Sequence, residues 1–75
     1  MKHMVYKSAA IITREGKWFV ARSAELGVVS QGKNIEEAKK NLQEAIELYL
    51  EDMPKERKYL SKEAPFVTAV DISRG

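Results

Sequence analysis

The strongest constraint on the fold is that one stretch of the chain has helical periodicity, between Asn34 and Pro54. Asn34 is a good N-cap residue, and Glu37 three positions later completes a capping box, while proline at position 54 cannot continue a helix. The apolar stripe between them consists of Ile35, Ala38, Leu42, Ala45, Ile46, Tyr49 and Met53. This spacing predicts a helix from Ile35 to about Asp52. One helix can cover one face of a sheet only, so the remaining segments must be arranged around that limit.

Two segments near the start of the chain have strand character, with many β-branched and aromatic residues: Val5 to Thr13 and Trp18 to Arg22. Gly16 between them supplies the backbone freedom of a tight turn, so the pair is predicted to form a β-hairpin. With Glu15 and Gly16 at the centre of the turn, Thr13 faces Trp18 across the hairpin.

Two further strands are predicted at Val28 to Gln31 and at Phe66 to Ile72, the latter from its alternating apolar pattern. The order is then β-β-β-α-β in a single α+β domain covering residues 1–75. Short, uncrossed connections favour a four-stranded mixed sheet in which the last strand lies parallel to the first, in the order 3-2-1-4. The helix is expected on one face of this sheet.

Small side chains on one face of the hairpin, Ala10 and Ala21, allow a helix to approach closely, so we expect the helix there. The opposite face is then largely apolar and has no cover within the chain. Uncovered apolar surfaces usually mark protein contacts, and a domain this small gains stability from a partner subunit. We therefore predict a homodimer or tetramer, with a partner or dimer interface formed by Val5, Ile11, Trp18, Val20, Arg22 and Val28.

Several chemistries have no residues to support them. The 75 residues include no cysteine, which removes disulfides and thiolate chemistry, and His3 is the only histidine, close to the terminus. The first predicted strand has no carboxylate for a two-metal nuclease site, and Ser30 has no second histidine to activate it. We expect no enzyme activity, no metal and no cofactor. No membrane span and no signal peptide are recognisable, so we expect a cytoplasmic protein.

The net charge of +2 is unevenly distributed along the chain. Residues 1–35 have six cations and two anions, a net charge of +4, whereas residues 36–52 have two cations and six anions, a net charge of −4. The basic excess is therefore diluted, and it lacks the interleaved aromatic residues of a nucleic-acid platform. The acidic segment has two interpretations, a solvated helix face or a surface that attracts a basic partner.

The order of short motifs resembles the HicB-like antitoxin domain from about Tyr6 to Glu51. The motifs are Trp18-Phe19-Val20-Ala21, Leu26-Gly27, Ser30-Gln31-Gly32, Ile35-Glu36-Glu37-Ala38, Asn41-Leu42, Ala45-Ile46 and Tyr49-Leu50. The resemblance implies a trimmed relative of the RNase H fold, in agreement with the predicted order of elements. It also implies a function, since HicB antitoxins bind and block HicA toxins, which are small mRNA endoribonucleases.

Many members of that family repress their own operon through a separate C-terminal DNA-binding domain, and we expect no such domain and no DNA binding by this chain alone. The resemblance therefore implies a toxin-neutralising protein with a HicA-like toxin as its partner. An alternative is a stand-alone oligomeric module that binds nucleic acid or acts in regulation. Trp18 on the uncovered face serves either as a dimer anchor or as a toxin-binding residue.

Overall fold

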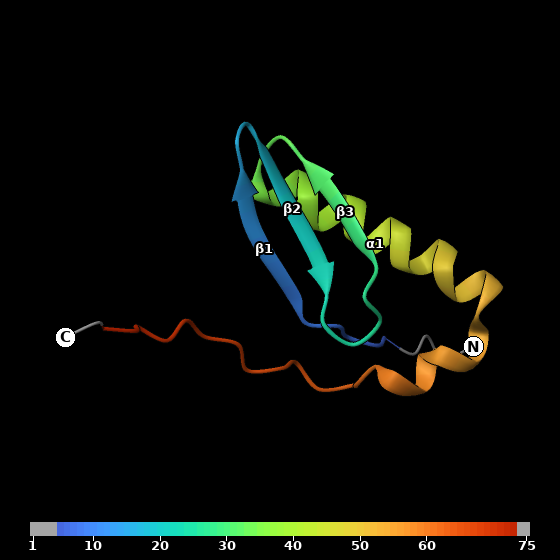
Figure 1. The fold of residues 1–75 in the computed structure, drawn as a ribbon. Helices are drawn as coiled ribbons and strands as arrows, with labels where there is room; N and C mark the ends of the chain where they lie inside the picture. Colours follow the sequence, from blue (N-terminus) through green and yellow to red (C-terminus); the bar gives the residue numbers. More distant parts are fainter. Residues whose placement is uncertain (1–4, 74–75) are drawn as a thin grey trace.

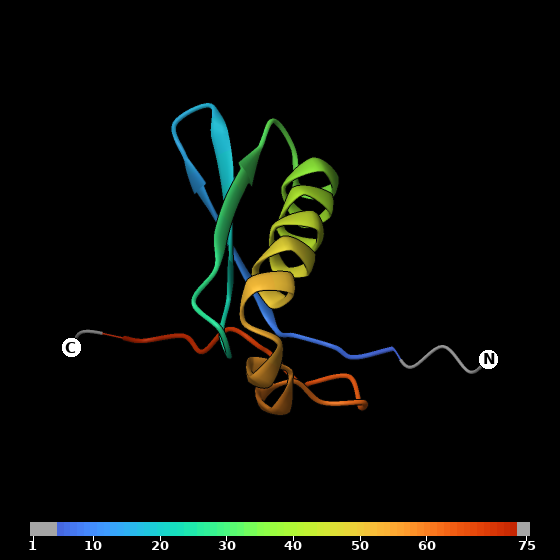
Figure 2. The same cartoon turned by 90° about the vertical axis from the view of Figure 1, so that its right-hand side faces the viewer.

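A single long helix lies against one face of a small sheet (Figures 1 and 2). The computed structural model describes residues 5–73, so His3 lies outside the described residues. The elements in chain order are β1 (Ala10–Glu15), β2 (Trp18–Ser23), β3 (Val29–Gly32), α1 (Ile35–Asp52) and the 3-10 helix η1 (Pro54–Tyr59). The three strands form an antiparallel sheet in the order β1-β2-β3.

The hairpin between β1 and β2 forms, but its register differs from the prediction. Glu15 pairs with Trp18, and Thr13 pairs with Val20, so Gly16 and Lys17 are the central turn residues. Gly16 has a φ of 61° and Lys17 has no positive φ, the combination that a type II′ turn requires. The predicted partners were wrong by two residues. Because side chains alternate with a period of two, each side chain nevertheless remains on its predicted face.

Helix α1 begins and ends where the sequence predicts. The side chain of Asn34 accepts a hydrogen bond from the backbone N–H of Glu37 at 2.8 Å, and the Glu37 carboxylate accepts one from the N–H of Lys33 at 2.9 Å. The first contact satisfies a donor that the first turn of a helix leaves unpaired, and the second joins the residue before the N-cap to the helix. The helix ends at Asp52, before Pro54.

The core lies between α1 and the face of the sheet that has the small residues, as predicted. Ala21, Ala38 and Leu42 form the buried cluster, and the partly buried side chains of Ala10, Ile12, Phe19, Val28 and Ile46 pack against it. The backbone of Gly32 lies against the first turn of the helix, where an added Cβ would be 2.7 Å from the carbonyl carbon of Glu37. Small residues therefore set the short distance between sheet and helix.

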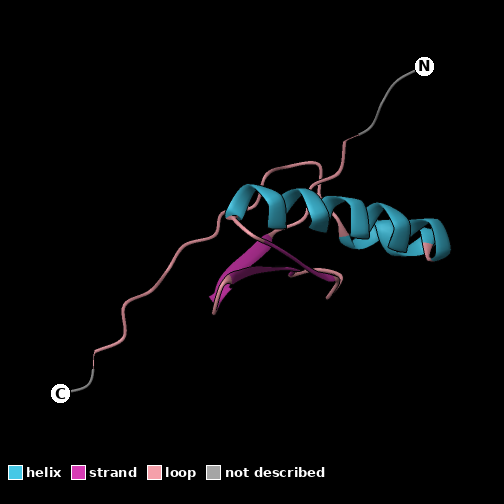
Figure 3. Cartoon of the chain, turned by 90° about the horizontal axis from the view of Figure 1, so that it is seen from above, coloured by secondary structure: helices cyan, strands magenta, loops and turns pink. Residues whose placement is uncertain are grey.

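The predicted four-stranded sheet is wrong, because residues 66–72 form no strand in the structure. The chain turns through η1 after the helix and then makes one isolated antiparallel bridge, between Lys7 and Ser61. Beyond that bridge it leaves the body of the domain as an extended arm (Figures 1 and 3). The alternating pattern indicates only that this segment can adopt an extended conformation. To pair as a strand, the segment also needs a connection that brings it to a free edge of the sheet.

Candidate interaction site

One face of the sheet has no helix over it, and we call it the open face. It is defined by the alternate residues of the three strands, which are Ile11, Thr13, Glu15, Trp18, Val20, Arg22, Val29 and Gln31. The register places Val20 between Thr13 and Gln31, and Arg22 between Ile11 and Val29. Trp18 is 42% exposed and Val29 is 55% exposed, whereas Ile11 and Val20 are half-buried. Val20 therefore lies at the centre of the open face between two polar side chains, Trp18 lies beside it towards the hairpin turn, and apolar and polar side chains alternate across the rest of the face.

The structure places four of the six predicted interface residues on the open face: Ile11, Trp18, Val20 and Arg22. Val28 and Val5 lie elsewhere, which corrects their predicted position. Val28 packs against the core cluster on the helix side, because Val29 pairs with Arg22 and takes the outward position, so that its neighbour Val28 points the other way. Val5 precedes β1 and lines a groove on the helix side. Sequence reasoning missed Val29, since alternation shows only that neighbours point opposite ways.

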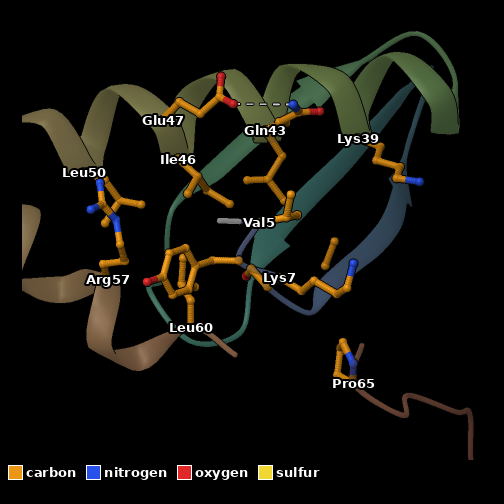
Figure 4. A pocket seen from close by; sticks show the side chains of 14 residues that line it. Val5, Lys7, Lys39, Gln43, Ile46, Glu47, Leu50, Arg57, Leu60 and Pro65 are labelled. Atoms are coloured by element: carbon orange, nitrogen blue, oxygen red, sulfur yellow. Dashed lines mark hydrogen bonds between the residues drawn. The ribbon is translucent and has the colours of Figure 1, made fainter. Parts of the chain in front are cut away.

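A groove of about 1000 Å³ lies on the helix side of the molecule (Figure 4). Three segments form its main walls, namely α1, the segment that leads into β1, and the turn after the helix, and Ala10 of β1 and Pro65 also line it. Ile46 and Leu50 of the helix supply apolar surface, and Lys7, Lys39, Glu47 and Arg57 supply charges (Figure 4). Leu42 adds to the apolar lining. No sequence pattern indicates this groove, because its walls come from three segments that only the fold brings together.

A chain of hydrogen bonds fixes the segment before β1 that forms one wall of the groove. The Glu25 carboxylate accepts from the backbone N–H of Ala9 at 2.9 Å and from the Ser8 hydroxyl at 2.6 Å. Because Ser8 has one proton to donate, the fully buried Ser23 hydroxyl donates to Ser8 across 2.7 Å, and it accepts from the N–H of Leu26. The network ties residues 8 and 9 to the turn after β2 and gives the groove a fixed wall.

Two contacts hold the turn after the helix in place: one joins α1 to η1, and the other joins η1 to the segment before β1. The Tyr49 hydroxyl donates a 2.6 Å hydrogen bond to the Glu56 carboxylate, which raises the pKa of Tyr49 above its ordinary value of 10.0, with desolvation as a second cause. The guanidinium of Arg57 lies 5.8 Å from the centre of the Tyr6 ring, a cation–π distance. These contacts position the turn that closes one end of the groove.

Nothing in residues 5–73 gathers three or more His, Cys, Asp or Glu side chains in a position to hold a metal ion. Within the same residues, α1 and η1 are too short or too polar to cross a membrane. What the geometry offers is surface for binding, in the form of an open sheet face and an apolar groove.

The fold and these surfaces define a small α+β protein with an antiparallel sheet that is covered on one side. The chain is 40% identical over 67 residues to a UPF0150 protein of Helicobacter pylori, and the alignment spans 88% of this chain and 93% of that relative. It therefore belongs to the UPF0150 family. No family model matches the sequence, and no solved structure matches it.

Proposed function

We propose that this protein is a HicB-like antitoxin that binds a HicA-type mRNA endoribonuclease and neutralises it without catalysis of its own. Two findings support the proposal: membership of the UPF0150 family, and the resemblance of the segment from about Tyr6 to Glu51 to the HicB-like domain. The exposure of the open face is the observation that best supports a binding function. This face presents apolar side chains that nothing in residues 5–73 covers.

The composition of the open face suits a protein partner. Trp18 has the large flat ring that often dominates the energy of an interface, and Val20, the next residue of β2 on this face, extends the apolar surface beside it. Glu15, Arg22 and Gln31 lie next to these apolar side chains and provide hydrogen-bonding groups. Protein–protein interfaces likewise combine aromatic and apolar side chains with hydrogen-bonding groups. By binding to the toxin, this face would block the access of RNA to the toxin.

The charge of the helix favours a basic partner. Five acidic residues of α1 are exposed to solvent, namely Glu36, Glu44, Glu47, Glu51 and Asp52. A surface of one sign accelerates encounter with a partner of opposite charge, and an RNA-binding enzyme presents a basic surface to the phosphate backbone. Because α1 lies on the opposite side of the sheet from the open face (Figure 2), its charge would act on the approach of the toxin and not on the contact itself.

The test is co-expression with a candidate toxin, a small basic protein with one central histidine encoded beside this chain. We expect the antitoxin to restore growth and to co-purify with the toxin. Trp18→Ala should weaken the complex by about 2 kcal/mol or more, which is roughly 30-fold in dissociation constant. Tyr59→Ala is the matched control, because Tyr59 is also an exposed aromatic residue but lies on η1, outside the open face.

If Trp18→Ala kept full affinity for the toxin, the open face would not be the binding surface. If the wild-type chain formed no complex with the toxin, the proposed antitoxin function itself would be wrong. Binding of the chain alone to RNA or DNA, with an affinity that falls steeply as salt is added, would favour the nucleic-acid-binding alternative.

A further inference from the structure

The C-terminal arm, residues 66–73, combines strand-like alternation with extreme exposure. Phe66 is fully exposed, and Val70 and Ile72 are 75% and 83% exposed. Together with Thr68 they form one side of an extended segment, and Val67, Ala69 and Asp71 form the other. The arm extends away from the sheet and the helix (Figures 1 and 3). An apolar, strand-like segment in water gains free energy by entering a hydrophobic site.

The body of the domain offers a site of matching shape. β1 is an edge strand, and its outer edge pairs with no strand among residues 5–73. The groove lies beside it, with Ala10 of β1 on one side and Leu42, Ile46 and Leu50 on the other. β1 has six residues and the arm segment 66–72 has seven, so both span roughly 20 Å when extended. A strand added to this edge would place one row of side chains in the groove.

The direction of the chain disfavours insertion of the arm into its own groove. Lys7 and Ser61 exchange two backbone hydrogen bonds, of 2.6 and 3.2 Å, in an antiparallel bridge. In an antiparallel pair the residues after Ser61 run towards those before Lys7, away from β1. Only residues 62–65, which end in Pro65, are available to reverse this course. In the structure they do not deliver the arm to β1 (Figure 1).

We infer that the arm of a second copy of this chain occupies the groove, so that two molecules exchange residues 66–72 reciprocally. Each arm adds a strand to the outer edge of the partner's β1 and buries apolar side chains against the partner's α1. Reciprocal exchange is a closed two-fold arrangement, which stops at a dimer. It also removes the exposed edge of β1, the part of a sheet most prone to uncontrolled association.

Charge complementarity supports this occupant. The charged residues that line the groove are Lys7, Lys39, Arg57 and Glu47, an excess of cations. Asp71 is the one charged side chain of the described arm residues, 66–73. The arm thus brings an acidic group to a basic groove. The exchange uses the helix side of the sheet, so it leaves the open face accessible and is independent of the proposed toxin binding.

Light scattering on the full chain, with arm variants, tests the exchange. We expect a dimer for the wild type and an increase of about tenfold or more in its dissociation constant for Phe66→Asp. Because Phe66 makes no buried contact within its own chain, the variant should keep the wild-type circular dichroism spectrum. Trp18→Ser on the open face is the matched control and should stay dimeric. A monomeric wild type, or a dimer that Phe66→Asp leaves intact, would overturn the inference.

Crosslinking locates the arm directly, since the chain has no cysteine of its own. Val70→Cys protein is mixed with Gln43→Cys protein and treated with a short bis-maleimide. We expect a covalent heterodimer, because Gln43 lines the groove. Thr13→Cys, exposed on the open face, replaces Gln43→Cys in the control and should give far less product. Equal crosslinking to positions 13 and 43 would contradict the exchange.

Discussion

The two faces of the three-stranded sheet differ in burial, because the helix covers one of them and leaves the other exposed. On the covered face, Ala21 is fully buried beneath Ala38 and Leu42 of the helix. On the open face, Trp18 and Val29 remain in contact with solvent although they are larger and more apolar than Ala21. The position of the helix explains the difference, because it covers only the face on which Ala21 lies, and large side chains such as Ile12 and Phe19 pack there as well. Apolar character alone therefore does not identify the core of a small domain with only one helix.

The comparison also separates stability from binding. The covered face holds the chain together, so changes there should lower the free energy of unfolding. The open face contributes less within one molecule, so changes there should affect association and lower the free energy of unfolding less. Variants on each face test this division.

Leu42→Ala should have the largest effect on stability. Removing this buried side chain leaves a cavity between helix and sheet, with an expected cost of about 2–5 kcal/mol in the free energy of unfolding. Urea denaturation followed by circular dichroism measures the loss. Leu48→Ala on the exposed side of the same helix is the control and should change stability by no more than about 0.5 kcal/mol. Equal losses would show that the covered face is not the core.

Gly32→Ala should have the next largest effect, a loss of about 1–3 kcal/mol in the free energy of unfolding, because the new methyl group would collide with the backbone of Glu37 and Ala38. The helix must move away from the sheet to accept it. Gly27→Asn is a useful comparison, since that position has open space and a φ of 73° that asparagine tolerates. The same denaturation experiment should find Gly27→Asn much closer to wild type, and the reverse order would contradict the close packing.

Asn34→Ala should cost about 1 kcal/mol, since the N–H of Glu37 loses its side-chain acceptor at the start of the helix. Asn34→Asp keeps an acceptor and adds a negative charge near the positive end of the helix dipole. We expect it to match or exceed the wild-type melting temperature in a thermal scan. A loss for Asn34→Asp as large as that for Asn34→Ala would show that the cap is not the cause.

Trp18→Ser should lower the free energy of unfolding by about 1 kcal/mol, well below the loss for Leu42→Ala, because Trp18 is 42% exposed and only the covered part of its ring loses contacts. Denaturation of this variant, monitored by circular dichroism, is the sharpest test of the division between the two faces. A loss comparable with that of Leu42→Ala would mean that the open face also stabilises the folded chain.

The smallest effect concerns the contact between α1 and η1. Because Glu56 raises the pKa of Tyr49, the folded chain holds the phenol proton more tightly than the unfolded chain. The stabilisation is present below the ordinary tyrosine pKa of 10.0 and is lost as the pH rises through the raised value. Glu56→Gln should lower the Tyr49 pKa in an ultraviolet titration. An unchanged titration would exclude the hydrogen bond in solution.

Much of the body of the domain follows from local sequence. Asn34 and Pro54 determined the limits of the helix, because capping and the missing proline N–H act within a few residues. Gly16 determined the location of the hairpin turn but not its centre, and so the register was wrong by two residues while the faces were right. The position of the helix over Ala10 and Ala21 was predictable from side-chain size.

The interaction surfaces were only partly predictable. Trp18 and Val20 were placed correctly by alternation, but Val28 was not, because the pairing of Val29 with Arg22 directs Val29 outwards and Val28 towards the core. The groove on the helix side could not be foreseen. Residues that line it, such as those at positions 5, 46 and 57, are far apart in the chain and share no local motif.

The sequence by itself determined the helix, the hairpin and the alternation of the strand residues between the two faces of the sheet, because these depend on near neighbours in the chain. The tertiary structure decided where the last apolar segment goes. The bridge between Lys7 and Ser61 sends residues 66–72 away from their own sheet, and no local pattern encodes which edge a strand-like segment reaches. Pairing partners depend on the path of the whole chain, whereas propensity depends on a few residues.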